Sequence, residues 1–284
     1  MSVTSLPDRY ALGPILGAGG SGEVYAATDR ISGERVAIKF FRDRRGWAAA
    51  LKASAVRHPN AVPIVEAGDH EGTAFLIMPL IEGHTLAHLL ERGTFTPRLA
   101  LDLLADVAAA LDDLHGMGIV HRDIKPSNIM VTDDSTRAVL LDYGAAASHD
   151  LDTEHEFVGT PAYAAPEHLG RERIGPAADV YGLAAVLAEC ITSTRLFSRP
   201  THEETMLAHA KRDRPLVETD DPVARVLAPV LEKGLAVNPN ERYGTASDLI
   251  EAAREVLGEL PPGLVDRPIG QTSTNEPLPT TEWS

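Results

Sequence analysis

Apolar and polar residues alternate along the first part of the chain, in short runs separated by turn-forming residues. A period of two residues is typical of a strand with one buried face. The runs that predict strands are residues 10–16, 23–28, 35–41, 61–66 and 73–80. One alanine-rich segment between them, residues 46–57, predicts a helix instead. We therefore expect a small β-rich unit over about residues 8–80.

From Thr96 onward the apolar residues recur at spacings of three and four, which indicates helices. Thr96 is suited to cap the first of these helices, and Pro97 to occupy its first position. The apolar stripe that follows consists of Ala100, Leu103, Leu104, Val107, Leu111 and Leu114. Further helices are predicted at residues 179–190, 227–235 and 246–257, and short strands at 129–131 and 138–141.

The second unit is therefore expected to be α-helical, over about residues 84–258. Residues 259–284 are rich in proline and threonine and should form a disordered tail, because they offer little apolar surface to bury. A unit of strands followed by a unit of helices places the protein in the α+β class.

Composition restricts the class of protein. The chain has 284 residues, a formal net charge of −15 and one cysteine, Cys190. The negative charge disfavours nucleic acid as a partner, and a single cysteine permits no internal disulfide. No run of about 18 apolar residues exists, and the first eight residues lack the pattern of a signal peptide. We therefore expect a cytoplasmic protein with no membrane segment in this chain.

Three glycines, Gly17, Gly19 and Gly22, separate the first two predicted strands. In a dinucleotide-binding unit, glycines at this spacing would open a helix. Here they open a strand, which favours a hairpin whose backbone N–H groups approach phosphates closely. A plain flexible turn is the alternative. Lys39, seventeen residues after Gly22 on the third strand, makes the phosphate-binding hairpin the better interpretation.

A polar stretch follows the longest helical pattern: His121-Arg122-Asp123-Ile124-Lys125-Pro126-Ser127-Asn128. A second acid, Asp142, comes fourteen residues after Asn128. Phosphoryl transfer to a hydroxyl needs one carboxylate that orients the hydroxyl. It also needs an amide oxygen and a second carboxylate that hold magnesium.

Together these motifs resemble those of eukaryotic-like (Hanks-type) serine/threonine protein kinases. The alanine-rich sequence with short loops is most similar to bacterial members of this family. The resemblance covers about residues 8–258. It implies the bilobal protein-kinase fold, with a small β-rich N-lobe and a larger α-helical C-lobe. It also implies ATP and Mg²⁺ as cofactors, and protein substrates that carry serine or threonine. The substrate, the signal and the formation of a homodimer stay open.

The resemblance implies roles for individual residues. Asp123, Lys125 and Lys39 would be catalytic, and Asn128 and Asp142 would hold the metal. The residues that would contact the nucleotide are Leu16, Gly17, Gly19, Gly22, Val24, Ala37, Lys39, Met78, Pro79, Ile81 and Met130.

Structural roles are implied as well. Glu167 would pair with Arg242, and Asp179 would hold the backbone of the catalytic loop. Tyr143 stands where the family usually has phenylalanine, and its hydroxyl needs a partner. Thr153 is the expected acceptor of a regulatory phosphate.

The chain departs from the family at one point. Kinases carry a glutamate on the small-lobe helix that pairs with the strand lysine, but no Asp or Glu occurs from Arg44 to Ala61. Ala49 occupies the position that matches the glutamate. Without nucleotide, we expect Lys39 to lie nearest Asp142 or to be solvated; Asp43 and Glu66 are the other nearby acids.

The sequence leaves three hypotheses about function. The first is an active kinase. The second is an ATP-binding pseudokinase or weak kinase that acts as a scaffold, because the helix glutamate is missing. The third is a nucleotide-binding oxidoreductase, which the strand after Gly22 disfavours.

Overall fold

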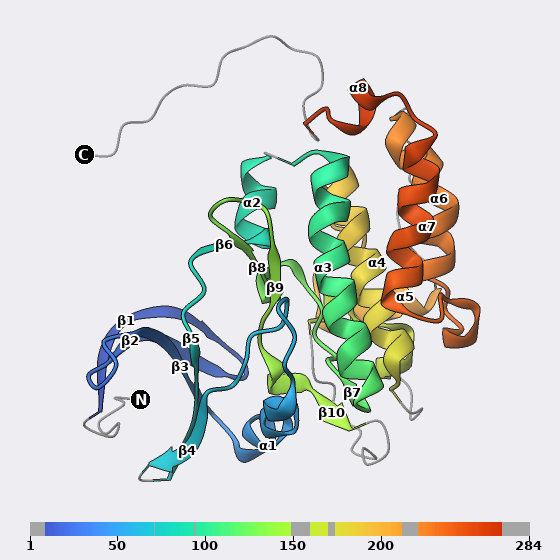
Figure 1. Cartoon of the computed structure of the whole chain (residues 1–284). Helices are drawn as coiled ribbons and strands as arrows, with labels where there is room; N and C mark the ends of the chain where they lie inside the picture. The colour runs from blue at the N-terminus through green and yellow to red at the C-terminus, as the bar shows by residue number, and fades with distance from the viewer. Residues whose placement is uncertain are drawn as a thin grey trace.

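The computed structural model describes residues 9–70, 72–93, 95–148, 160–169, 174–211 and 221–268. A twisted sheet and one helix form the smaller part, and the remaining helices form the larger part (Figure 1). The α+β prediction is confirmed by this arrangement.

The sheet of the smaller part has five antiparallel strands. Their spatial order is β1-β2-β3-β5-β4. The strands are β1 (Tyr10–Gly19), β2 (Gly22–Asp29), β3 (Arg35–Phe41), β4 (Glu66–His70) and β5 (Thr73–Pro79). One face carries a small core of aromatic and branched side chains that includes Phe40 and Phe75. The opposite face of β3 belongs to the main core, through Phe41.

The turn between β1 and β2 depends on Gly22. Its φ of 153° lies in a region that L side chains rarely adopt, and a Cβ atom there would lie 2.0 Å from the carbonyl oxygen of Phe40. Gly19 pairs with Gly22 across the turn. The predicted hairpin is therefore confirmed, and the helix that an oxidoreductase would need is absent from this described turn.

The fourth predicted strand was placed wrongly. β4 begins at Glu66, where the prediction for residues 61–66 ends. Pro63 interrupts the earlier segment and has no N–H to donate to a neighbouring strand. Ala61 instead forms an isolated parallel bridge with Leu140 of the larger part, so this segment joins the two parts.

Helix α1 (Arg44–Lys52) crosses beside the sheet and continues as a short 3₁₀ turn (Ala53–Ala55). Asp43 caps its first turn by accepting a hydrogen bond from the N–H of Gly46 at 2.8 Å. The helix therefore starts two residues before the predicted segment and ends five residues earlier as a regular helix.

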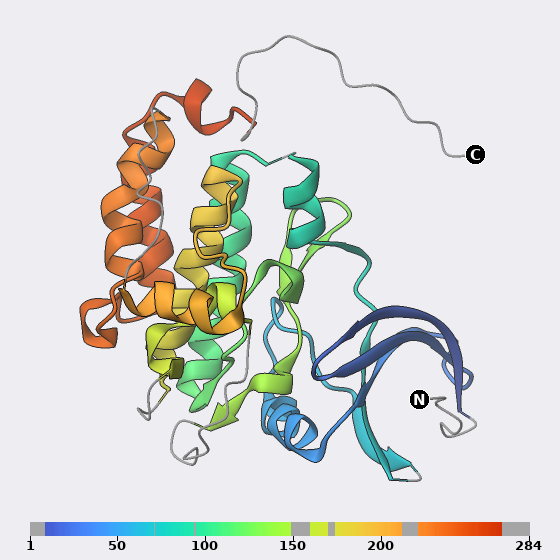
Figure 2. The ribbon, with the colours of Figure 1, turned by 180° about the vertical axis from the view of Figure 1, so that it is seen from behind.

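The larger part is built around helix α4 (Pro176–Thr192), which is buried along nearly its whole length. The surrounding helices are α2 (Leu86–Arg92), α3 (Pro97–Gly116), α5 (His202–Lys211), α6 (Pro222–Gly234) and α7 (Ala246–Gly258) (Figure 2). Thr96 caps α3 as predicted. Within the described ranges, no helix is long and apolar enough to cross a membrane.

Short strands line the side of the larger part that faces the sheet. They are β6 (Gly83–Thr85), β7 (Ile119–Val120), β8 (Ile129–Thr132), β9 (Ala138–Leu140) and β10 (Ala147–Ser148). β8 pairs with both β6 and β9, and β7 pairs with β10. The loops that leave these strands carry the polar residues singled out above.

The predicted start of the tail at residue 259 is wrong. Helix α8 (Pro262–Val265) packs on the larger part with Val265 buried. Asp266 accepts a hydrogen bond from Arg98 at 2.6 Å, and Arg267 pairs with Asp221 at 2.7 Å. These contacts join residues far apart in sequence, so local composition did not reveal them. Residues 269–284 lie outside the described ranges.

An ion pair between Glu167 and Arg242 is buried under α4. The guanidinium donates two parallel hydrogen bonds to the carboxylate, both 2.7 Å long. It also donates to the carbonyl oxygens of Ala236 and Ala177, each at 2.8 Å. The predicted pair is confirmed, and it fixes the segment around Glu167 against the helical core.

Replacing Glu167 with alanine should destabilise the protein by about 3–5 kcal/mol, because the guanidinium of Arg242 would stay buried without its counter-charge. Chemical unfolding of the purified chain measures this. Arg254→Ala is the matched control, since Arg254 pairs with Asp102 at the surface and should cost much less. Equal losses in the two variants would contradict the analysis.

Candidate active site

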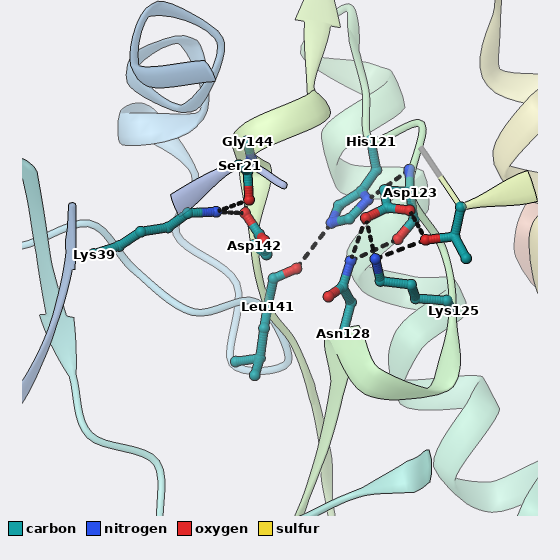
Figure 3. A network of polar contacts seen from close by, with 10 residues as sticks. Ser21, Lys39, His121, Asp123, Lys125, Asn128, Leu141, Asp142 and Gly144 are labelled. Atoms are coloured by element: carbon teal, nitrogen blue, oxygen red, sulfur yellow. Dashed lines mark hydrogen bonds and ion pairs between the residues drawn. The ribbon is translucent and has the colours of Figure 1, made fainter. Parts of the chain in front are cut away.

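The candidate site lies where the sheet meets the helical part. Figure 3 shows Lys39 reaching from β3 toward Asp142, while Asp123, Lys125 and Asn128 gather on the side of the helical part. Asp142 follows β9 by two residues, and the loop of residues 121–128 follows β7 directly. Strand ends therefore present both groups of residues at the same junction.

Asp179 of α4 holds the loop by its backbone. Its carboxylate accepts hydrogen bonds from the N–H groups of His121 and Arg122, both 2.8 Å long, and contacts Nε2 of His115 at 2.8 Å. Burial alone would raise the pKa of Asp179, but the contact with His115 and the backbone N–H group of His121 outweigh it and lower the pKa. The predicted role of Asp179 is confirmed by these contacts.

Asp123 is surrounded by donors. The amide nitrogen of Asn128 donates to its backbone carbonyl at 2.8 Å and to Oδ2 at 3.0 Å. Lys125 pairs with Oδ2 at 2.7 Å. The hydroxyl of Thr160 donates to Oδ1 at 2.9 Å and accepts from Lys125 at 2.7 Å. Because its amide nitrogen is used on Asp123, Asn128 directs its amide oxygen away from that residue (Figure 3).

Thr160 was not among the predicted site residues. It lies thirty-seven residues after Asp123 in the sequence, and a lone threonine at such a distance is ordinary by itself. Its neighbour Pro161 begins a 3₁₀ turn that fixes the chain there. Thr153 lies outside the described residues.

Lys39 and Asp142 form an ion pair across the junction. The ammonium also donates to the hydroxyl of Ser21 in the glycine hairpin at 2.8 Å. The prediction that Lys39 lies nearest Asp142 is confirmed. Asp43 instead caps α1, and Glu66 accepts from the hydroxyl of Tyr10 at 2.7 Å, so neither acid replaces the missing glutamate.

The pair also sets the charge of Asp142. Burial would raise the pKa of its carboxyl, but the positive charge and hydrogen bond of Lys39 and the N–H of Gly144 lower it. Gly144 permits this arrangement, because a Cβ atom there would lie 3.0 Å from both the ammonium of Lys39 and Oδ1 of Asp142.

Tyr143 has the partner that its hydroxyl needs. The hydroxyl donates to the carbonyl oxygen of Val62 at 3.0 Å, and its ring meets the ring of His121 edge to face. Burial raises the pKa of the Tyr143 phenol. His121 in turn contacts the carbonyl oxygen of Leu141 at 2.9 Å. The aromatic contact thus links the loop after β7 to the segment that carries Asp142.

The predicted nucleotide residues include a set on one face of the sheet. Val24 pairs with Lys39, and Ala37 pairs with Met78. Opposed residues of antiparallel strands share a face, as do residues two apart on one strand. These four side chains therefore line one face. Ala37 is buried, whereas Leu16 on β1 is half exposed, at 51%.

Three other predicted nucleotide residues lie outside this face of the sheet. Met130 lies on β8 opposite Thr85 of β6. Pro79 ends β5, and Ile81 lies in the connection between β5 and β6. This connection links the smaller part to the larger one.

Replacing Tyr143 with phenylalanine should destabilise the fold by about 1–3 kcal/mol, because the carbonyl of Val62 would lose its buried donor. The comparison of unfolding free energies tests this. Tyr25→Phe is the control, since the Tyr25 hydroxyl donates to Glu23, two residues away on the same strand. A Tyr143→Phe variant as stable as the parent would show that the hydrogen bond is not needed.

Comparisons with known proteins agree with the geometry. A sequence model of the family described as "Protein kinase domain" matches residues 10–253. Serine/threonine-protein kinase PknH of Mycobacterium bovis is 35% identical over 272 residues, which are 90% of this chain and 45% of that protein. Serine/threonine-protein kinase PknD of Mycobacterium tuberculosis is 37% identical over 263 residues, 87% of this chain and 40% of that protein. The chain thus spans less than half the length of these relatives.

Proposed function

Because this chain belongs to the protein kinase family, we propose that it transfers the γ-phosphoryl group of ATP to serine or threonine hydroxyls of proteins. One observation carries the proposal: Asn128 is hydrogen-bonded to Asp123, and on the other side of the same junction Asp142 pairs with Lys39 (Figure 3). The names of the mycobacterial relatives support the serine/threonine class and a role in bacterial signalling.

Asp123 is proposed to orient the attacking hydroxyl and to accept its proton. Its carboxylate lies among the donors Lys125, Asn128 and Thr160, which hold it in one orientation. Lys125 would neutralise charge on the phosphoryl group during transfer. Positioning and electrostatic stabilisation then supply most of the rate enhancement.

The donor set fits magnesium. The amide oxygen of Asn128 and the carboxylate of Asp142 are hard oxygen ligands, and Mg²⁺ commonly binds through one or two such groups together with phosphate oxygens. When bound, the metal neutralises charge on the phosphates. In the described ranges no group of three acidic, histidine or cysteine side chains forms a metal site of its own.

The nucleotide is proposed to lie under the glycine hairpin, with Lys39 on its α and β phosphates. Adenine would lie against Val24, Ala37 and Met78, which share one face of the sheet. Pro79 lacks an N–H but keeps its carbonyl, and Ile81 keeps both groups. The connection between the lobes therefore retains the backbone groups that adenine needs.

A weak kinase or an ATP-binding scaffold is the second candidate. The observation that favours it is the composition of α1, which has no acidic residue to pair with Lys39. The intact set of Asp123, Asn128 and Asp142 argues against a complete loss of chemistry. Incorporation of phosphate into a generic basic protein, with ATP and magnesium, separates the two candidates.

Asp123→Asn should abolish phosphate transfer and leave ATP affinity nearly unchanged, because Asp123 would face the hydroxyl. Asp142→Asn should weaken magnesium-dependent ATP binding as well. Phosphate incorporation and calorimetric titration with ATP measure the two effects. Asp133→Asn, on the exposed turn after β8, is the control that should change neither. Full activity in Asp123→Asn would refute the assigned role.

Ala49→Glu should raise turnover more than ATP affinity, because an acid at this position of α1 would give Lys39 a second ionic partner. Steady-state kinetics with varied ATP separates the two parameters. The neighbouring Ala48 is exposed, so Ala48→Glu adds the same charge on another side of the helix. The assignment of position 49 fails if both variants, well folded, keep the parent's turnover.

A further inference from the structure

The ammonium of Lys39 is buried, with 4% of its side chain exposed, and its neighbours must replace the water it has lost. An ammonium group has three N–H donors. Asp142 and Ser21 accept two of them. The ring of Phe41 also lies beside the ammonium, with its centroid 5.0 Å from the nitrogen. This distance is within the range of a cation–π contact.

We propose that the ring of Phe41 positions Lys39 for phosphate binding and thereby takes over part of the task of the acid that α1 lacks. This inference rests on the proposed kinase function, and Phe41 acts through Lys39 instead of touching the nucleotide. Phe41 lies two residues after Lys39 on β3, so the two side chains share a face of the sheet.

Helix α1 holds the ring in place. A Cβ atom built on Gly46 would lie 3.2 Å from the edge of the Phe41 ring and 3.5 Å from the carbonyl oxygen of Gly144. The first turn of the helix therefore rests on the ring and on the segment that carries Asp142. The ring thus lies against both the first turn of α1 and the ammonium of Lys39.

The helix is itself anchored to the sheet. The indole N–H of Trp47 donates to the carbonyl oxygen of Phe75 at 3.2 Å. Arg44 lies over the Trp47 ring, 5.6 Å from its centroid, and pairs with Asp69 of β4. These contacts fix α1 without any charge directed at Lys39, and they keep the helix pressed against Phe41.

The ring contact differs from the other two contacts of Lys39. Asp142 is needed for magnesium, and Ser21 lies in the hairpin that would cover the phosphates. When nucleotide enters, both can exchange Lys39 for other partners. The ring has no such competing task, so it keeps the ammonium near its place while the partners change.

The test uses fluorinated phenylalanines placed at position 41 of the full chain. One to five fluorines weaken the negative face of the ring while its shape changes little, so packing and cation attraction are separated. In nucleotide-free protein, the rate at which an acylating reagent labels Lys39 is measured by mass spectrometry. We expect the rate to rise stepwise, by about fivefold over the series.

ATP affinity is measured on the same proteins as the second quantity, beside the labelling rate. Affinity for ATP with magnesium should fall stepwise by a similar factor of about five. Phe41→Leu should lie at the weak end of the series and Phe41→Tyr near the parent. The matched control is the same series at Phe40, which is adjacent and buried but packs on the opposite face of the sheet; it should change neither quantity.

Equal labelling of Lys39 across the folded series at position 41, or an equal response at position 40, would overturn the proposal and leave Phe41 a packing residue. The fluorinated series decides even where Phe41→Leu fails to fold. The labelling needs no nucleotide and no catalysis. The labelling rate of Lys39 can therefore stay unchanged in a protein that phosphorylates, and can rise in one that does not. A failure of this proposal is thus distinguishable from a failure of the proposed kinase function.

Discussion

The structure depends most on the carboxylate of Asp179, which joins the buried helix α4 to the loop that carries Asp123. The residue is 1% exposed and accepts three hydrogen bonds, two of them from the loop backbone. A buried carboxylate is tolerated only when donors surround it. Loop and helix therefore stabilise one another, and Asp123 acquires the rigidity of the helical core.

The smaller lobe positions Lys39 by weaker means. Lys39 contacts Asp142, Ser21 and the face of Phe41, and each partner belongs to a different element. The two halves of the site are thus held unequally: the side of Asp123 is fixed to the core, whereas the side of Lys39 depends on how α1 and the hairpin pack. The missing helix acid matters because it falls on the adjustable side.

Local rules predicted the features that local physics determines. The hairpin needs glycine at position 22, and the cap and apolar stripe of α3 predicted that helix. Helix α5 is largely polar, so its sequence has no clear helical period of apolar residues. Helix α2 has only seven residues and starts directly after a strand, so its pattern is too short to indicate a helix. The roles of Thr160 and Phe41 depend on residues brought together by the fold, and α8 is held by contacts far apart in sequence. The family's motifs identified the acids and the lysine of the site, but no motif describes a residue that would replace the acid missing from α1.

If the ring of Phe41 does the work of an acid, the small-lobe helix influences Lys39 through packing. An ion pair between helix and lysine can break and re-form as the helix swings, which gives two distinct states. A ring pressed by Gly46 against the lysine has no comparable alternative partner. Movement of α1 would instead loosen Phe41 and the Asp142 segment together, because the same turn rests on both. Control of Lys39 would then act where α1 is anchored to the sheet, through the bond of Trp47 to β5 and through the pair of Arg44 with Asp69 on the edge strand β4.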